Sequence, residues 1–398
     1  MTKKITIANF YPVWPPVGGG QRRIFFLARE LAKKYLVDIV VLGRDGTNRT
    51  IEFGENLREI TIAAEQRFRD CEHVVDAKVK MAADLAYTLH WNECQSYQRY
   101  LRKSISDSAA VVSAHPYSTY AVLDARGNRT VPFVFDSQNV EYFQKTPVLA
   151  DQPAYLEEIG KIERTSLEFA ALSIACSQND AEGFAKLYNV DASKIRIVEN
   201  GVDAIGVPQL DSAKRAVIRA ELGLENKTVA LFAGSFHFPN FKAADRVLEM
   251  AKRLPGTIFV FLGSVCKYDA LANCGLSNVI LLDAVDESTK WLAFHVSDIG
   301  LNPMETGSGT NIKLFEYAAA ELHILTTKFG ARGTPFVDGK DFTVCEIDEF
   351  ASQIGRISAL SRAAQTKIGK NARNCALKHV DWSVIGSVYR KAFDDLLA

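Results

Sequence analysis

The stretch that most constrains the fold lies late in the chain, at 298–327. It starts as an apolar, strand-like run and passes through a glycine-rich loop. It continues with apolar residues at helical spacing and ends in a β-branched run. Strand, glycine loop, helix and strand form the unit from which parallel α/β sheets are built. The sequence therefore predicts an α/β fold, with a glycine loop at the start of a helix.

The same stretch offers a place for an anion. A helix N-terminus presents N–H groups without partners and a positive dipole, and glycine lets the backbone approach a phosphate closely. Glu316 follows two turns into the predicted helix, where its carboxylate could accept hydrogen bonds from a sugar diol. The alternative is a loop-to-helix connection without a ligand, since glycine loops are common in α/β proteins.

The chain before this stretch shows the same alternation. Its opening residues indicate a strand at 5–11, a glycine loop, a helix at 22–35 and a strand at 37–42, which predicts parallel strands joined by right-handed crossovers. At 398 residues the chain is longer than one core usually supports, so we expect two domains.

We place the domain boundary near 204–209, where a turn gives way to a polar connector. The predicted domains are an N-terminal Rossmann-like domain at 1–205 and a C-terminal Rossmann-like domain at 206–382. A C-terminal helix at about 383–398 is expected to cross back to the first domain.

Two features of the first domain are candidates for binding. Gly18–Gly20 do not form a Gly-x-Gly-x-x-Gly signature, and no acidic ribose partner follows, which argues against a nicotinamide enzyme. These glycines could let the backbone approach a ligand, or could simply form a tight turn. His115 stands at the C-terminal end of a buried strand, the edge where ligands of open α/β sheets collect, and could contact a ligand there. The alternative for His115 is a structural or merely exposed histidine.

Composition excludes several classes of function. Lys and Arg together number 47, as do Asp and Glu, which argues against nucleic-acid binding led by bulk charge. The seven cysteines are scattered, with no Cys-x-x-Cys pair, so we expect neither a disulfide framework nor a metal site, and a cytoplasmic, reducing compartment fits.

No apolar run reaches about 18 residues, so any membrane contact would be peripheral. Basic and aromatic residues at 91–103 could form such a surface, or a solvated helix face.

Five segments, in this order along the chain, carry a resemblance to a known family. They are Gly18–Gly20, Phe135–Glu141, Asn200–Asp203, Phe232–Asn240 and Gly307–Glu316. Together they resemble the family-4 group of bacterial glycosyltransferases, which have the GT-B fold.

The resemblance implies two Rossmann-like domains facing a cleft. A sugar linked to UDP or GDP would bind the C-terminal domain, and a glycan or lipid-linked acceptor the N-terminal one. Transfer would need no metal or resident cofactor and would retain the anomeric configuration. The catalytic candidates are His115, Lys242 and Glu316. The donor-binding candidates are Gly19, Gly20, Gly234, Ser235, Ser308, Gly309, Thr310, Asn311, Ile312 and Lys313.

Two departures from the family pattern bear on activity. Ser308 stands where the family usually has its first glutamate, for which Glu305 could substitute, and Ser235 stands where it usually has arginine. Lys242 and Lys313 are therefore the candidates for the cation that binds the diphosphate. The departures keep a second hypothesis open, a GT-B-shaped nucleotide-sugar-binding or scaffold protein without transferase activity. A sugar-nucleotide epimerase is a third.

Overall fold

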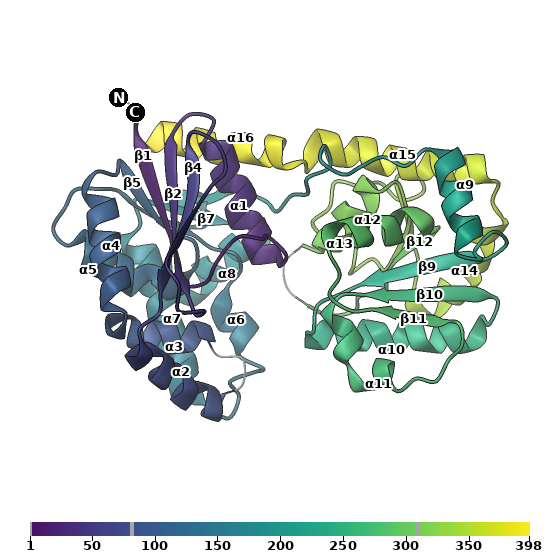
Figure 1. Cartoon of the computed structure of the whole chain (residues 1–398), viewed down its shortest axis with the longest axis horizontal. Coiled ribbons are helices and arrows are strands. Elements are labelled where there is room, and N and C mark those ends of the chain that lie inside the picture. The colour runs from purple at the N-terminus through teal and green to yellow at the C-terminus, as the bar shows by residue number, and fades with distance from the viewer. Residues whose placement is uncertain (1, 80–82, 308–309) are drawn as a thin grey trace. The chain divides into compact units, whose positions relative to one another are not determined.

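The computed structural model describes residues 2–79, 83–307 and 310–398 (Figure 1). Contacts divide the chain into two units, Met1–Asn200 with Ile385–Ala398, and Gly201–Val384. Each unit is a mainly parallel sheet with helices packed against it (Figure 1), as the sequence predicts.

In the described residues, the first unit contains an eight-stranded sheet in the order β3-β4-β2-β1-β5-β6-β7-β8. All of these pairings are parallel except β3 with β4. Its strands are β1 (Lys4–Asn9), β2 (Leu36–Gly43), β3 (Arg49–Glu52), β4 (Leu57–Ala63), β5 (Ala110–Ser113), β6 (Phe133–Asp136), β7 (Leu172–Ala175) and β8 (Ile195–Ile197). Its helices are α1 (Gly19–Leu31), α2 (Gln66–Lys78), α3 (Ala83–His90), α4 (Gln95–Ser106), α5 (Thr119–Arg126), α6 (Glu141–Lys145), α7 (Pro153–Phe169) and α8 (Gln178–Tyr188).

The described part of the second unit forms a six-stranded sheet in the order β11-β10-β9-β12-β13-β14, with parallel pairings throughout. Its strands are β9 (Thr228–Ala233), β10 (Thr257–Leu262), β11 (Val279–Leu282), β12 (Ile299–Asn302), β13 (His323–Thr326) and β14 (Thr343–Val344). Its helices are α9 (Ser212–Glu221), α10 (Phe238–Arg253), α11 (Asp269–Ala272), α12 (Glu287–Val296), α13 (Ile312–Ala319), α14 (Phe350–Ala359) and α15 (Arg362–His379), and α16 (Trp382–Leu396) begins in this unit.

Strand β9 shows why the second sheet is covered on both faces. Val229 and Leu231 belong to one apolar core with residues of α12, α13 and α15. Ala230 and Phe232 belong to another core with residues of α10 and α14. Because successive side chains of a strand point to opposite faces, an unbroken apolar strand requires a helical layer on each side.

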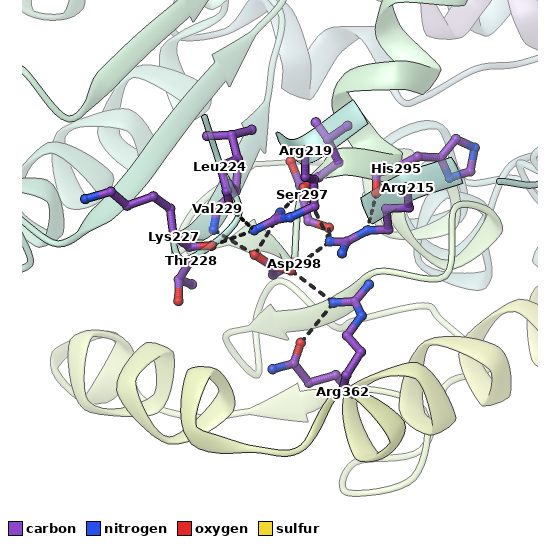
Figure 2. Close-up of polar contacts among 12 residues, drawn as sticks. Arg215, Arg219, Leu224, Lys227, Thr228, Val229, His295, Ser297, Asp298 and Arg362 are labelled. Atoms are coloured by element: carbon purple, nitrogen blue, oxygen red, sulfur yellow. Dashed lines mark hydrogen bonds and ion pairs between the residues drawn. The ribbon is translucent and has the colours of Figure 1, made fainter. Parts of the chain in front are cut away.

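A network of charged side chains fastens helices to the amino end of this sheet (Figure 2). Asp298, just before β12, accepts hydrogen bonds from Arg215 at 2.7 Å and from the Val229 N–H at 2.9 Å. It also forms ion pairs with Arg219 at 3.3 Å and with Arg362 at 3.0 Å. One carboxylate therefore joins α9 and α15 to the starts of β9 and β12.

The last helix returns to the first unit. The hydroxyl of Tyr35 donates to Asp394, and Arg390 lies 3.7 Å from Glu30. A Cβ on Gly386 would lie 2.1 Å from Glu30 Cγ, so only glycine allows this approach. The helix was expected at about 383–398, and its segment Ile385–Ala398 belongs to the first unit.

The first helix and one edge strand illustrate how the structure differs from the predicted elements. The first helix begins at Gly19 rather than at Arg22, with Gly18 as the residue before it. Strand β3 was not predicted, because its four residues are mostly exposed and carry no apolar periodicity. It pairs antiparallel with β4, at the edge of the sheet.

Candidate functional site

Both sheets have a point where their connections diverge. In the second sheet β9 and β12 are neighbours, and the chain leaves β9 toward β10 but leaves β12 toward β13 on the other side. In the first sheet, β1 and β5 are related in the same way. Ligands of open α/β sheets bind at the carboxyl ends of such strands. These ends are followed by Gly234 and by residues 303–307 and 310–311 in one unit, and by Gly18–Gly20 and His115 in the other.

Side-chain contacts join the end of β9 to the start of α13. A Cβ on Gly234 would lie 3.2 Å from Asn240 Cγ, so the two residues pack closely. The Asn240 amide donates to the Ser235 carbonyl at 3.0 Å, and its oxygen accepts a hydrogen bond from Lys313 Nζ at 3.0 Å. Asn240 thus links Ser235, where the resembled family usually has arginine, to the ammonium group of Lys313.

Lys313 is half-buried in an apolar environment. Its ammonium lies 4.2 Å from the centre of the Phe232 ring and 3.9 Å from Met304 Sδ. Burial lowers the pKa of Lys313 to about 7, against a smaller opposing effect of Glu316. In the described part of the chain, no carboxylate forms an ion pair with it. The site therefore presents a cation that the protein does not neutralise.

Glu316 lies one turn further along α13 and is held by a lysine. Lys290 Nζ on α12 donates to Glu316 Oε1 at 2.7 Å, and both side chains are largely buried, with 11% and 12% exposed. Sequence reasoning missed Lys290, because it lies on a different helix. The signal that could have found it is a lysine directly before the apolar run Trp291–Phe294, since a buried lysine requires a partner.

The residues that lead into α13 are supported by the turn that follows β13. Asn311 donates to the Gly330 carbonyl at 2.9 Å, and a Cβ on Gly333 would lie 3.2 Å from Thr310 Oγ1. Gly307 has φ 129°, which a residue with a side chain rarely adopts. The turn after β13 therefore lies against this loop.

Two predicted donor-binding residues, Ser308 and Gly309, lie outside the described residues. Helix α13 begins at Ile312, so the N–H groups of Ile312 and Lys313 have no acceptor inside the helix. The Leu314 N–H donates to the Asn311 carbonyl at 3.0 Å.

Two further charged candidates lie apart from this group of contacts. Lys242 is exposed, with its ammonium 5.0 Å from the centre of the equally exposed Phe238 ring. Glu305, which could have replaced the missing first glutamate, pairs with Arg246 at 3.1 Å. Lys313 is therefore the candidate lysine that the structure connects to Ser235, through Asn240.

His115 belongs to a buried polar cluster of the first unit. Its Nε2 lies 2.9 Å from the Tyr11 hydroxyl, and its Nδ1 lies 3.7 Å from Glu141 Oε1. Tyr117 donates to Glu141 Oε2 at 2.7 Å. Burial disfavours the charged form of Glu141, but the interactions with His115, Lys145 and Tyr117 together outweigh it and lower the pKa of Glu141. Tyr11 and Glu141 therefore flank the His115 ring within the first unit.

Gly19 and Gly20 were predicted to lie in a loop open to a ligand, and this prediction is wrong for their secondary structure, since both belong to the first turn of α1. A Cβ on Gly20 would lie 2.5 Å from Gln138 Oε1 and 2.8 Å from the Tyr11 hydroxyl. The close approach at Gly20 is made by side chains of its own unit.

Among the described residues, no group of three or more His, Cys, Asp or Glu side chains is placed to hold a metal ion. In the same residues, no helix combines the length and the apolar character needed to cross a bilayer.

Comparisons with known families match both units. A family model described as Glycosyltransferase Family 4 matches residues 17–204, and one described as Glycosyl transferases group 1 matches residues 227–359. No curated protein gives a significant sequence match.

Several solved structures resemble the whole chain. Anabaena HepE in complex with UDP and glucose has a TM-score of 0.71 at 12% identity, covering 99% of this chain and 100% of HepE. Sucrose-phosphate synthase from Thermosynechococcus elongatus has a TM-score of 0.74 at 16% identity, covering 99% and 100%. WaaG, a glycosyltransferase involved in lipopolysaccharide biosynthesis, has a TM-score of 0.66 at 18% identity, covering 96% and 98%. At these identities the likeness concerns the fold.

Proposed function

This chain belongs to the family-4-like glycosyltransferases of the GT-B fold, and we propose that it moves a sugar from a UDP- or GDP-linked donor to a glycan or lipid-linked acceptor. Transfer retains the anomeric configuration and requires no metal. The likeness to HepE, whose structure contains UDP, supports a uridine donor. The likeness to WaaG supports a place in surface polysaccharide or glycolipid synthesis.

The observation that carries this proposal is the half-buried Lys313 without a carboxylate partner in the described residues, at the divergence point of the second sheet. A desolvated cation is costly unless an anion joins it. The diphosphate of a sugar nucleotide is such an anion. Glu316, one turn away and oriented by Lys290, is placed to accept hydrogen bonds from the ribose hydroxyls.

In the proposed reaction, an acceptor hydroxyl attacks the anomeric carbon on the face from which the diphosphate leaves. The bond between the anomeric carbon and the phosphate oxygen breaks, and that oxygen takes the proton of the hydroxyl. Negative charge grows on the leaving diphosphate, so fixed positive groups lower the barrier. Lys313 and the N–H groups at the start of α13 supply them, and no protein base is needed. His115, in the first unit, is assigned to a sugar hydroxyl or the acceptor.

The test is a panel of sugar nucleotides, measured by thermal shift and by release of free UDP or GDP, with and without EDTA. We expect one donor to raise the Tm and to be turned over equally in EDTA. NMR of the product should show the anomeric configuration of the donor. Glu316→Gln should weaken UDP binding about tenfold, whereas the exposed control Glu225→Gln should not.

A protein that shows neither binding nor turnover at millimolar donor would contradict the proposal. Binding without product from any acceptor would favour the binding or scaffold protein instead.

A further inference from the structure

The diphosphate of a donor carries more negative charge than Lys313 alone can balance, and Ser235 occupies the position of the usual arginine. A second cation near the glycine loop would meet that need. Arg332, in the turn after β13, is half-buried, and its guanidinium carbon lies 3.9 Å from the centre of the Phe329 ring.

Arg332 lies beside the loop that precedes α13. A Cβ on Gly307 would lie 3.8 Å from Arg332 Nη2 and 3.6 Å from Pro239 Cβ. The next residue, Gly333, packs against Thr310, where a Cβ would lie 3.2 Å from Oγ1. The side chain of Arg332 therefore reaches one flank of the predicted phosphate loop.

The turn that carries Arg332 is held tightly against strands β12 and β13. A Cβ on Gly330 would lie 2.5 Å from both Asn302 Nδ2 and Thr326 Oγ1, so only glycine fits there. The Gly330 N–H donates to Thr327 Oγ1 at 2.8 Å, and the Gly330 carbonyl accepts from Asn311 at 2.9 Å. Arg332 is thus mounted on a fixed support rather than on a free loop, which favours a precise contact.

The charge of Arg332 has no counterpart among the described residues. Its one hydrogen bond there runs from Nη1 to the Phe329 carbonyl at 2.8 Å, and it forms no ion pair. Burial lowers the pKa of Arg332, with no nearby carboxylate opposing this effect. The edge formed by Nε and Nη2 remains for a ligand, and this edge suits two oxygens of one phosphate group.

We propose that Arg332 binds the diphosphate of the sugar-nucleotide donor together with Lys313, and that it makes the site prefer diphosphates over monophosphates. The proposal rests on the proposed function, and Arg332 is not among the site residues predicted from the sequence. Arg332 supplies the positive charge that the usual arginine would supply at the position of Ser235. It does so from the turn after β13 instead of the loop after β9.

The test compares Arg332→Met with wild type, by calorimetric titration of UDP, UMP, GDP, GMP and inorganic pyrophosphate. We expect Arg332→Met to weaken diphosphate and pyrophosphate binding about tenfold or more, and monophosphate binding less. Arg332→Lys should restore part of the loss, since lysine keeps the charge but not the paired donors. The exposed control Arg356→Ala removes the same charge and should change nothing.

Equal diphosphate affinity in wild type and Arg332→Met would overturn the inference, while loss of binding in Lys313→Met would still support the proposed function. If wild type bound no nucleotide, the proposed function would fail. Pyrophosphate binding that disappears in Arg332→Met would then still identify an anion site, and its absence would overturn both ideas. If Arg332→Met lowers the Tm, the diphosphate affinity of Arg332→Lys tests the inference instead, because lysine preserves the cation over the Phe329 ring.

Discussion

The two ends of the second sheet differ in how their positively charged side chains are paired. At the amino end, Arg215, Arg219 and Arg362 share the Asp298 carboxylate (Figure 2). Arg215 also donates to the His295 carbonyl at 2.7 Å and the Ser297 carbonyl at 2.9 Å, at the end of α12. At the carboxyl end, Arg332 and Lys313 form no ion pair with any described residue.

The difference separates a structural use of charge from a binding use. Arginines that pair with a carboxylate and with the carbonyls at a helix end stabilise the fold. Their positive charge is already compensated, so they have little charge available for a ligand. Charges that are desolvated but not neutralised weaken the free protein, and that cost is recovered when an anion binds. Four predictions test the comparison.

The largest effect is expected at the amino end. Asp298→Ala leaves Arg219, which is largely buried, without its carboxylate and removes the acceptor for the Val229 N–H. Its free energy of unfolding, measured with denaturant, should fall by about 3–5 kcal/mol. The exposed control Asp348→Ala should lose little. Weakened UDP binding by the folded fraction of Asp298→Ala would contradict a purely structural role.

At the carboxyl end, Lys313→Met should have the opposite signature. UDP affinity should fall by about tenfold to hundredfold, since a charged contact to phosphate is lost. The free energy of unfolding without ligand should not fall, because methionine removes a desolvated charge and keeps the apolar stem against Phe232. Calorimetric titration and denaturant unfolding measure the two quantities. A large loss of stability with unchanged affinity would place Lys313 with the structural charges.

Donor affinity should also depend on pH through Lys313. In the free protein burial lowers the pKa of Lys313 to about 7, whereas a bound diphosphate favours the ammonium form. The protonated lysine binds better, so affinity should fall by up to about tenfold as the pH rises from about 6 to about 8. An intact sugar nucleotide is the right probe, because its diphosphate does not titrate in this range. If the pH dependence of donor affinity were unchanged in Lys313→Met, this lysine would be excluded as its source.

The smallest effect is expected for the most exposed member of the Asp298 cluster. The Arg362 side chain is 51% exposed, and Asp298 keeps two better-buried partners without it. Arg362→Ala should therefore cost less than about 1 kcal/mol of unfolding free energy. A loss as large as that of Asp298→Ala would mean that the three arginines act as one unit.

Much of the fold could be predicted from local patterns. The strand predicted at 37–42 lies within β2, and the strands and the helix predicted at 298–327 are present as β12, α13 and β13. The α/β pattern follows from the same apolar periodicity. Strand β3 could not be predicted, since an exposed edge strand carries no apolar repeat.

The candidate site could be predicted only in part. Glu316 and Lys313 were found because they lie on the helix that follows the glycine loop. Lys290 and Arg332 were not, because each comes from another element that approaches that helix only in the folded sheet.

The sequence by itself determined the alternation of strands and helices and the likeness to a transferase family, because periodicity and motif spacing are properties of neighbouring residues. Only the tertiary structure decided which charges are neutralised. Asp298 meets three arginines and Lys313 meets a neutral amide, and these partners are set by the order of strands in the sheet. Electrostatic pairing depends on distance and burial in space, so a one-dimensional pattern does not contain it.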